Sequence, residues 1–247
     1  MRQQLRALGI LTAIGVAAGG LAACNSINSI DRQSFEDDSA LSGKITSVRL
    51  ENGSGGVTVT GTDGGSASLH RKVRYDKGAA KPSAATHRIE GGVLILGGCS
   101  GSCSVQYTVQ VPAGIPVSGD VTSGDVSLHQ VGTVDVSAGS GDIALDGISG
   151  AVKVKTTSGE ITGKGLAGGA IDTRTGSGDV HLTPGKPSNV QITAGSGDVS
   201  LTVPSAAYRV TVKTGSGDKD VKVPDDPAGK YEIGVKTGSG DVGIKAS

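Results

Sequence analysis

Residues 171–182 read Ile-Asp-Thr-Arg-Thr-Gly-Ser-Gly-Asp-Val-His-Leu, and residues 190–201 read Val-Gln-Ile-Thr-Ala-Gly-Ser-Gly-Asp-Val-Ser-Leu. Each stretch contains an alternating apolar run, a Gly-Ser-Gly-acid turn and a second alternating run, which indicates two short β-strands joined by a tight turn. This unit recurs at intervals of about 19 residues across residues 113–247. Such a repeat is typical of proteins built by stacking similar units.

The Ser-Gly-acid element is the most constant part of the repeat. Glycine directly precedes the acid in each copy, which indicates a backbone position that needs a positive φ angle or leaves no room for a Cβ atom. We expect the acid to accept hydrogen bonds from turn amides, and we place an additional early copy at Ser118-Gly119-Asp120. The predicted repeat turns are Gly124 and Asp125, Gly141 and Asp142, Gly159 and Glu160, Gly178 and Asp179, Gly197 and Asp198, Gly217 and Asp218, and Gly240 and Asp241.

One unit cannot be stable alone, because its few aliphatic side chains do not offset the conformational entropy lost on ordering. The units must therefore stack, and the sequence predicts an all-β protein. We expect a β-solenoid, a single-stranded parallel β-helix-like stack of strand-turn-strand coils of about 19 residues each. An antiparallel sandwich or barrel is the competing fold, because strands separated by glycine turns also form hairpins. The nearly constant period favours the stack.

The two ends of the repeat region differ in regularity. Residues 44–112 form a less regular β region in which residues 48–59 look like a degenerate copy of the unit, and this region could cap the first coil. The last coil ends at Ser247 without an evident cap. Its exposed strand edge is a candidate surface for strand addition by a partner.

The N-terminus reads as a targeting segment, with Arg2 and Arg6 before an apolar stretch. The sequence Leu21-Ala22-Ala23-Cys24 resembles the bacterial lipobox, which implies a lipoprotein signal peptide over residues 1–23, cleavage before Cys24 and diacylglycerol on its sulfur. The protein would then be anchored to the cell membrane on the extracytoplasmic face, with a flexible tether in residues 24–43. The alternative is an uncleaved membrane helix followed by a buried cysteine.

Cys99 and Cys103 remain as an even pair in an exported protein, where disulfides persist. They lie in a Gly/Ser turn between the apolar run 93–96 and the alternating run 105–111. We expect a disulfide at the tip of a hairpin. Two free thiols or a redox-active pair are the alternatives.

Charge and aromatic content restrict the partners. Lys+Arg and Asp+Glu each number 23, which argues against nucleic acid, and Trp 0 with Phe 1 and Tyr 4 leaves few stacking platforms for bases or sugars. A set of outward cations either neutralises the acids or contacts wall polymers or lipid head groups. Its members are Lys153, Lys155, Arg174, Lys213 and Lys236.

The recurring acids suit turn architecture better than chemistry. One alternative is a calcium-dependent structural module, although each turn offers only one carboxylate. Another is a carbohydrate-active β-helix enzyme, although the acids are uniform and an active site would break the repeat at one place. His129 and His181 fall at outward positions, and no Ser/His/Asp constellation emerges. We therefore predict no catalytic residue, metal site or cofactor.

Three features together resemble a known family: the lipobox, the segment Tyr107-x-Val109-x-Val111-Pro112-Ala113-Gly114, and the succession of Thr/Ala-Gly-Ser-Gly-Asp-Val units. They are similar to the DUF4097 group of bacterial β-strand-repeat proteins, which are labelled adhesins, over residues 45–247. The resemblance implies a β-helical envelope protein without assigned catalytic residues. We expect a non-enzymatic, lipid-anchored protein with a structural, adhesion-like or envelope-interaction role, whose partner is an envelope protein or a cell-wall polymer.

Overall fold

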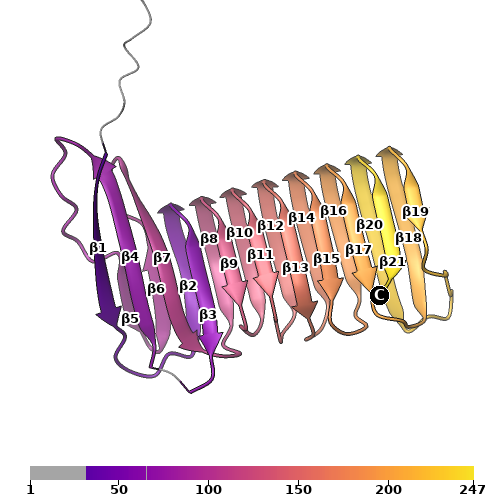
Figure 1. Ribbon diagram of the computed structural model, residues 1–247, viewed down its shortest axis with the longest axis horizontal. Coiled ribbons are helices and arrows are strands. Elements are labelled where there is room, and N and C mark those ends of the chain that lie inside the picture. Colours follow the sequence, from indigo (N-terminus) through magenta and orange to yellow (C-terminus); the bar gives the residue numbers. More distant parts are fainter. Residues whose placement is uncertain (1–31, 65) are drawn as a thin grey trace, which may run out of the picture. The chain divides into compact units, whose positions relative to one another are not determined.

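The computed structural model describes residues 32–64 and 66–247, within a compact unit that spans Arg32–Ser247 (Figure 1). The predicted signal peptide, the lipobox residues Leu21, Ala22 and Ala23, and the lipidation site Cys24 lie outside the described residues. The described residues form a ten-stranded and an eleven-stranded β-sheet. Within them, no helix has the length and hydrophobicity needed to cross a membrane.

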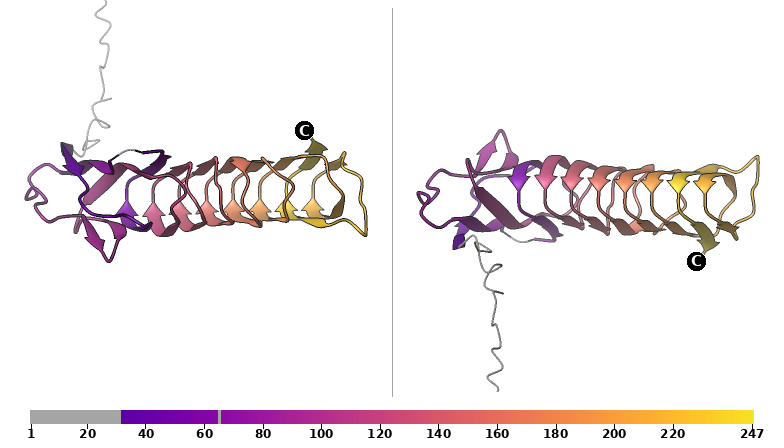
Figure 2. Two further views of the ribbon diagram at one scale, coloured as in Figure 1. Left: turned by 90° about the horizontal axis from the view of Figure 1, so that it is seen from below. Right: turned by 90° about the horizontal axis from the view of Figure 1, so that it is seen from above.

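The repeat folds into coils, each with its first strand in the ten-stranded sheet and its second strand in the eleven-stranded sheet. Figure 2 shows these coils as successive rungs that join the two layers. Neighbouring coils pair in parallel, so the predicted all-β stack is confirmed and the antiparallel sandwich is wrong for the repeat. The regular coils are β8 (Val117–Ser123) with β9 (Val126–His129), β10 (Val134–Ser140) with β11 (Ile143–Asp146), β12 (Val152–Ser158) with β13 (Ile161–Leu166), β14 (Ile171–Ser177) with β15 (Val180–Pro184), and β16 (Val190–Ser196) with β17 (Val199–Val203).

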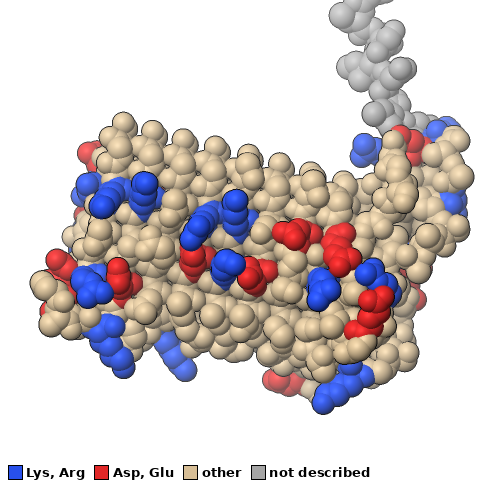
Figure 3. All heavy atoms as spheres, turned by 180° about the vertical axis from the view of Figure 1, so that it is seen from behind, with Lys and Arg blue, Asp and Glu red and all other residues tan. Residues whose placement is uncertain are grey.

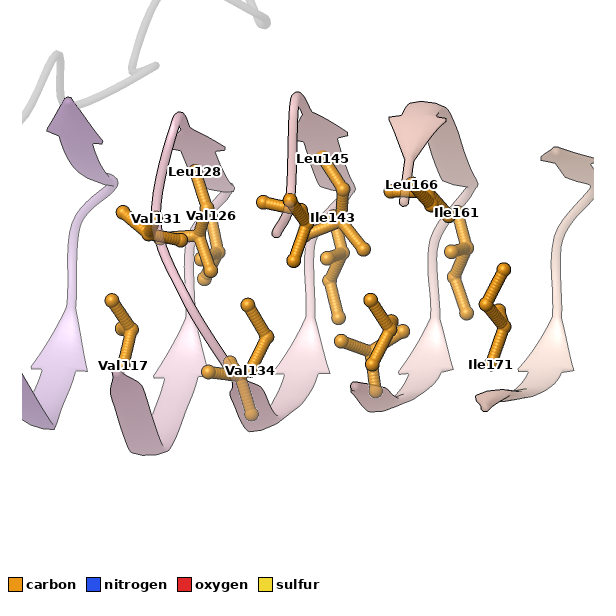
Figure 4. Packing of buried hydrophobic residues seen from close by; sticks show 14 of the residues in the cluster. Val117, Val126, Leu128, Val131, Val134, Ile143, Leu145, Ile161, Leu166 and Ile171 are labelled. Atoms are coloured by element: carbon orange, nitrogen blue, oxygen red, sulfur yellow. The ribbon is translucent and has the colours of Figure 1, made fainter. Parts of the chain in front are cut away.

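Aliphatic side chains of the two sheets fill the space between them (Figure 4). Alternation along each strand directs one set of residues inward, and in-register stacking places like residues against like. Val134, Val152, Ile171 and Val190 form such a column, and all four are buried. β-branched residues suit this arrangement because they pack well on a pleated surface.

The coils turn from one sheet to the other at the predicted Ser-Gly-acid corners. Gly178 has φ 137°, a conformation that residues with a Cβ atom rarely adopt, and a Cβ atom there would overlap the carbonyl oxygen of Gly159 in the preceding coil. The same two constraints act on the equivalent glycine of the other regular coils. The spacing between coils therefore depends on glycine at this position.

The N-terminal region contains a further coil and a cap. The predicted degenerate copy forms β2 (Ser47–Ser54) and β3 (Val57–Thr62), which stack on β8 and β9. Outside this coil lie β6 (Val93–Gly97) and β7 (Cys103–Pro112), followed by the antiparallel neighbours β5 (His87–Glu90) on β6 and β4 (Ser68–Asp76) on β7. The chain order of the coils is therefore not their spatial order at this end.

The predicted flexible tether is wrong for part of residues 24–43. Arg32–Ala40 form β1, the edge strand of the eleven-stranded sheet, paired antiparallel with β4. Three consecutive acids of β1 face three bases of β4 in register: Glu36 with Lys72, Asp37 with Arg71, and Asp38 with His70. The polar residues that suggested a tether include acids that pair with the bases of β4.

The prediction that the last coil ends the stack is also wrong. The terminal strands β20 (Tyr231–Ser239) and β21 (Val242–Ala246) insert between the β16/β17 coil and the coil formed by β18 (Tyr208–Ser216) and β19 (Lys219–Val221). Lys219 occupies the register position that buried Val242 holds in the neighbouring coil. A coil with a lysine at this position is tolerated where only one of its sides is covered. At this end of the stack the edge strands are accordingly β18 and β19, and the loop after β19 partly covers β18, where Asp225 Oδ1 accepts from the Val210 N–H at 2.8 Å and the Asp226 N–H donates to the Tyr208 carbonyl oxygen at 2.8 Å.

The Ser118-Gly119-Asp120 sequence is not a corner. Gly119 pairs with Leu50 and Val136 inside β8, where its Cβ atom would overlap the Leu50 carbonyl oxygen. The corner of this coil is at Gly124 and Asp125.

Candidate functional site

The corner acids form a ladder of hydrogen bonds along the stack. Asp142 Oδ1 accepts from the backbone N–H of Glu160 at 2.8 Å, and Asp179 Oδ1 accepts from that of Asp198 at 2.8 Å. The expectation that these acids accept hydrogen bonds from turn amides is confirmed, with the addition that the amide belongs to the neighbouring coil. Further rungs join Asp125 to Asp142, Asp198 to Asp241, and Asp241 to Asp218.

Through this ladder, the accepting aspartates bind neighbouring coils to one another. Within residues 32–64 and 66–247, no three His, Cys, Asp or Glu side chains lie close enough together to hold a metal ion. The corner geometry thus favours the architectural interpretation for five of the aspartates, because each of these carboxylates already binds a backbone donor: Asp125, Asp142, Asp179, Asp198 and Asp241.

A row of cations crosses the outward face of the ten-stranded sheet (Figure 3). Lys155 pairs in register with Arg174, Arg174 with Thr193, Thr193 with Lys236, and Lys236 with Lys213. We call Lys155, Arg174, Lys236 and Lys213 the cationic row; all four are exposed. Paired strands lie about 4.8 Å apart, so the row presents positive charge at a repeating distance.

Acids on this sheet face neutralise part of its positive charge, including that of Arg174 in the row. Lys153 Nζ lies 3.1 Å from Asp135 Oδ2, and Arg174 Nη2 lies 3.0 Å from Asp172 Oδ2. These acids belong to the same sheet face and not to the corners, so the expectation that the cations neutralise the corner acids is wrong for Lys153 and Arg174. Figure 3 shows that the row continues toward the opposite end of the stack as acidic side chains, where Glu51 and Asp120 stand in register.

The opposite face, on the eleven-stranded sheet, carries a groove of about 390 Å³ over β9, β11, β13 and β15. Asp146 Oδ2 lies 3.3 Å from Lys164 Nζ and 3.7 Å from His129 Nδ1, and His181 Nε2 lies 3.8 Å from Glu160 Oε1. The outward placement of His129 and His181 is confirmed. The sequence did not indicate that they border one groove, because only the stacking register brings them there.

The N-terminal cap holds a polar network that sequence reasoning missed. Arg71, largely buried, donates to Asp37 Oδ1 at 2.7 Å and to Thr86 Oγ1 at 2.9 Å, and this donation lowers the pKa of the Asp37 carboxyl. The Tyr107 hydroxyl lies 2.7 Å from the Gly97 carbonyl oxygen and 2.8 Å from that of Thr86. Burial raises the pKa of Tyr107 to about 12 and lowers that of His87. A tyrosine within an otherwise aliphatic alternating run was the available signal.

The disulfide between Cys99 and Cys103 is confirmed, but its predicted hairpin is wrong. β6 belongs to the ten-stranded sheet and β7 to the eleven-stranded sheet, so the strands on either side of the disulfide do not pair. The disulfide closes a longer corner between the sheets, in the coil next to the Ser54-Gly55-Gly56 corner.

The model of the family described as Toastrack DUF4097 matches residues 85–247. The chain belongs to the Toastrack DUF4097 family. The matched residues run from the cap strand β5 through the last coil, and the match agrees with the family resemblance of the sequence.

Solved structures of similar fold cover most of this Toastrack chain at low identity. One is a “putative adhesin” from Parabacteroides merdae, with TM-score 0.43 and 11% identity over 87% of this chain and 96% of that one. Another is a “putative cell adhesion protein” from Clostridium sporogenes, with TM-score 0.37 and 14% identity over 87% of this chain and 100% of that one. A third is a “putative adhesin” from Parabacteroides distasonis, with TM-score 0.41 and 12% identity over 88% and 98% of the two chains. No curated protein matches the chain significantly.

Proposed function

We propose that this Toastrack protein is a non-catalytic, adhesion-like lipoprotein that binds an anionic polymer of the cell envelope through its cationic row. Four exposed cations in one register row carry the proposal. Two pairs of cations, separated by the strand that carries Thr193, lie along one line of the sheet and can contact a linear chain of repeated negative charges, and each added contact raises avidity. The row needs no conformational change to meet such a chain, because the strand ladder fixes its spacing.

The lipid anchor at Cys24 is the second part of the proposal. The lipobox sequence Leu21-Ala22-Ala23-Cys24 supports it, and the Cys99–Cys103 disulfide suits an exported protein. Replacement of Cys24 by alanine should move the protein from the membrane fraction to the soluble fraction of the expressing cells. Continued fractionation with membranes would exclude diacylglycerol on Cys24 as the anchor.

The polymer-binding part is tested with the full chain and fluorescent long-chain polyphosphate as a soluble probe. The triple variant Lys155→Gln, Lys213→Gln and Lys236→Gln should lose about tenfold or more of its affinity at low salt, and added salt should weaken the unaltered protein. The matched control is Lys44→Gln, Lys186→Gln and Lys245→Gln, which removes equal charge at exposed lysines away from the row.

An equal loss in both triple variants would show nonspecific attraction and contradict the proposal. Binding to vesicles of anionic lipid but not to polyphosphate would also contradict it, because the row would then serve a membrane surface. Arg174 stays in both variants because it is already paired with Asp172.

A further inference from the structure

The groove over β9 to β15 includes the β12/β13 coil, which departs from the repeat in its second strand. In this coil Glu160 replaces the corner aspartate, and Gly163 takes the register position of Leu145 and Leu182. The pairing of β13 with β15 shifts register between Lys164 and Leu166, and the Leu166 side chain turns into the core beside Gly163 (Figure 4). Leu166 therefore fills the core beside Gly163, and the outer surface of this coil differs from that of its neighbours.

The floor of the groove is formed by small residues of one register row. Ala144 and Thr162 occupy one register row, in which Ser127 precedes them on β9 and His181 on β15 and Ser200 on β17 follow. The adjacent row carries His129, Asp146 and Lys164. Longer side chains therefore surround a floor made by the methyl group of Ala144 and by backbone.

The polar groups that border the groove are mainly hydrogen-bond donors. The lining contains Lys164, the two imidazoles, the hydroxyl of Thr162 and one carboxylate, that of Asp146, while Glu160 Oε1 lies outside the lining, 3.8 Å from His181 Nε2. Asp146 lies 3.3 Å from Lys164 Nζ and 3.7 Å from His129 Nδ1. The His129 distance exceeds that of a hydrogen bond, so Asp146 does not occupy the Nδ1 atom of this ring.

We infer that this groove is a binding site for one acidic sugar unit, a saccharide that carries a carboxylate or a phosphate. A volume of about 390 Å³ falls in the range of small-molecule sites. Lys164, His129 and His181 hold the acidic group, and Asp146 and Thr162 bind sugar hydroxyls. The groove opens on the outward face, so a unit within a longer glycan can enter. The site lies on the sheet opposite the cationic row and does not depend on it.

The test follows the imidazole signals of the labelled full chain by NMR during titration with glucuronate and glucose 6-phosphate. The signals of His129 and His181 should shift saturably, with dissociation constants of about 1–10 mM, because aromatic stacking is absent from the groove lining. Those of His70 and His87 in the cap serve as internal references. Glucose, acetate and inorganic phosphate should each bind at least about fivefold more weakly, since each supplies only part of the ligand.

Two variants probe the groove directly. Lys164→Gln should weaken binding of both acidic sugars at least about fivefold, whereas Lys245→Gln on β21 of the same sheet should not. Ala144→Leu should fill the floor and abolish the shifts, whereas Ser200→Leu, on β17 in register with His181, should retain them. Unchanged binding in Ala144→Leu would overturn the site. Equal shifts at all four histidines, no shift with either sugar acid, or equal binding of glucose would overturn the ligand class.

Discussion

The Asp142 carboxylate accepts a hydrogen bond from the backbone N–H of Glu160, one coil along the stack, at 2.8 Å. The corner glycine Gly141 donates in parallel to the Ser158 carbonyl oxygen at 2.9 Å. Side chain and backbone thus tie adjacent coils together at the corner, where a strand ladder would otherwise be interrupted. This link explains why Ser-Gly-acid recurs in a chain whose strand sequences vary.

Replacement of Gly178 by alanine should destabilise the protein by about 2–4 kcal/mol. The added Cβ atom would force a strained φ angle and overlap the Gly159 carbonyl oxygen. The matched control is Gly243→Ala on β21, where the nearest atom to a Cβ would be the Val199 carbonyl oxygen at 4.0 Å. Urea denaturation measures both variants, and equal destabilisation would refute the role of the corner.

The corner ladder should stabilise the stack without calcium. Asp198→Ala removes the acceptor of the Asp241 N–H and should cost about 1 kcal/mol, whereas Asp198→Asn keeps an acceptor oxygen and should cost less. The thermal midpoint of the unaltered protein should be the same with calcium or with chelator. A midpoint that falls on chelation would instead support the calcium module.

Docking of β1 should weaken in acid. Donation from Arg71 to Asp37 holds the folded-state pKa of this carboxyl below its ordinary value of 3.8. The stabilisation is therefore complete above about pH 4–5 and declines as the pH falls through the folded-state pKa. Amide exchange of Arg32–Ala40 should accelerate at pH 3 relative to that of β10, after correction for intrinsic rates.

The variant Asp37→Asn should show this faster exchange already at neutral pH. Asp120→Asn is the control, because Asp120 stands on an exposed position of β8. Unaltered protection of β1 in Asp37→Asn would mean that the ion pair does not hold the strand.

Tyr107 should make the protein sensitive to alkali. Its folded-state pKa is raised to about 12 by burial, whereas the unfolded chain ionises near 10. Its contribution to stability is therefore complete below pH 10 and is lost as the pH rises toward 12. Tyr107→Phe should be less stable at neutral pH by about 1 kcal/mol, because the hydroxyl no longer donates to Gly97 or Thr86.

The alkaline decline of the Tyr107→Phe variant should be smaller than that of the unaltered protein. Urea unfolding at pH 8 and at pH 11 measures the difference. An identical decline in the two proteins would assign the alkaline sensitivity to other groups.

Hydrogen exchange should reveal the inserted C-terminal coil. β20 has neighbours on both sides, whereas β18 ends the ten-stranded sheet. Amides of Ile233 and Val235 should therefore exchange more slowly than those of Val210 and Val212, although they lie nearer the chain end. The reverse order would support the coil order expected from the sequence alone.

The candidate site could be predicted only in part. The repeat positions Lys155, Arg174 and Lys213 on outward sites, so a cationic face was visible in the sequence. The order of the cations along this face was not visible, because Lys236 lies between Thr193 and Lys213 only after the terminal coil inserts. The groove could not be predicted either, because the Ser-Gly-acid turns indicate neither the effect of Gly163 nor the register shift after Lys164.

The sequence by itself determined the coil. Its alternation of Val and Ile, its aliphatic interior and its glycine corners are local properties, and their repetition admits stacking as the way to bury the apolar faces of the chain. Only the tertiary structure decided the ends. β1 docks because its acids pair with bases of β4, about 35 residues away in the chain. β20 lies between β16 and β18 because the coil placed there has another coil on each side. These arrangements depend on contacts between segments that are distant in the sequence, and local sequence patterns do not specify such contacts.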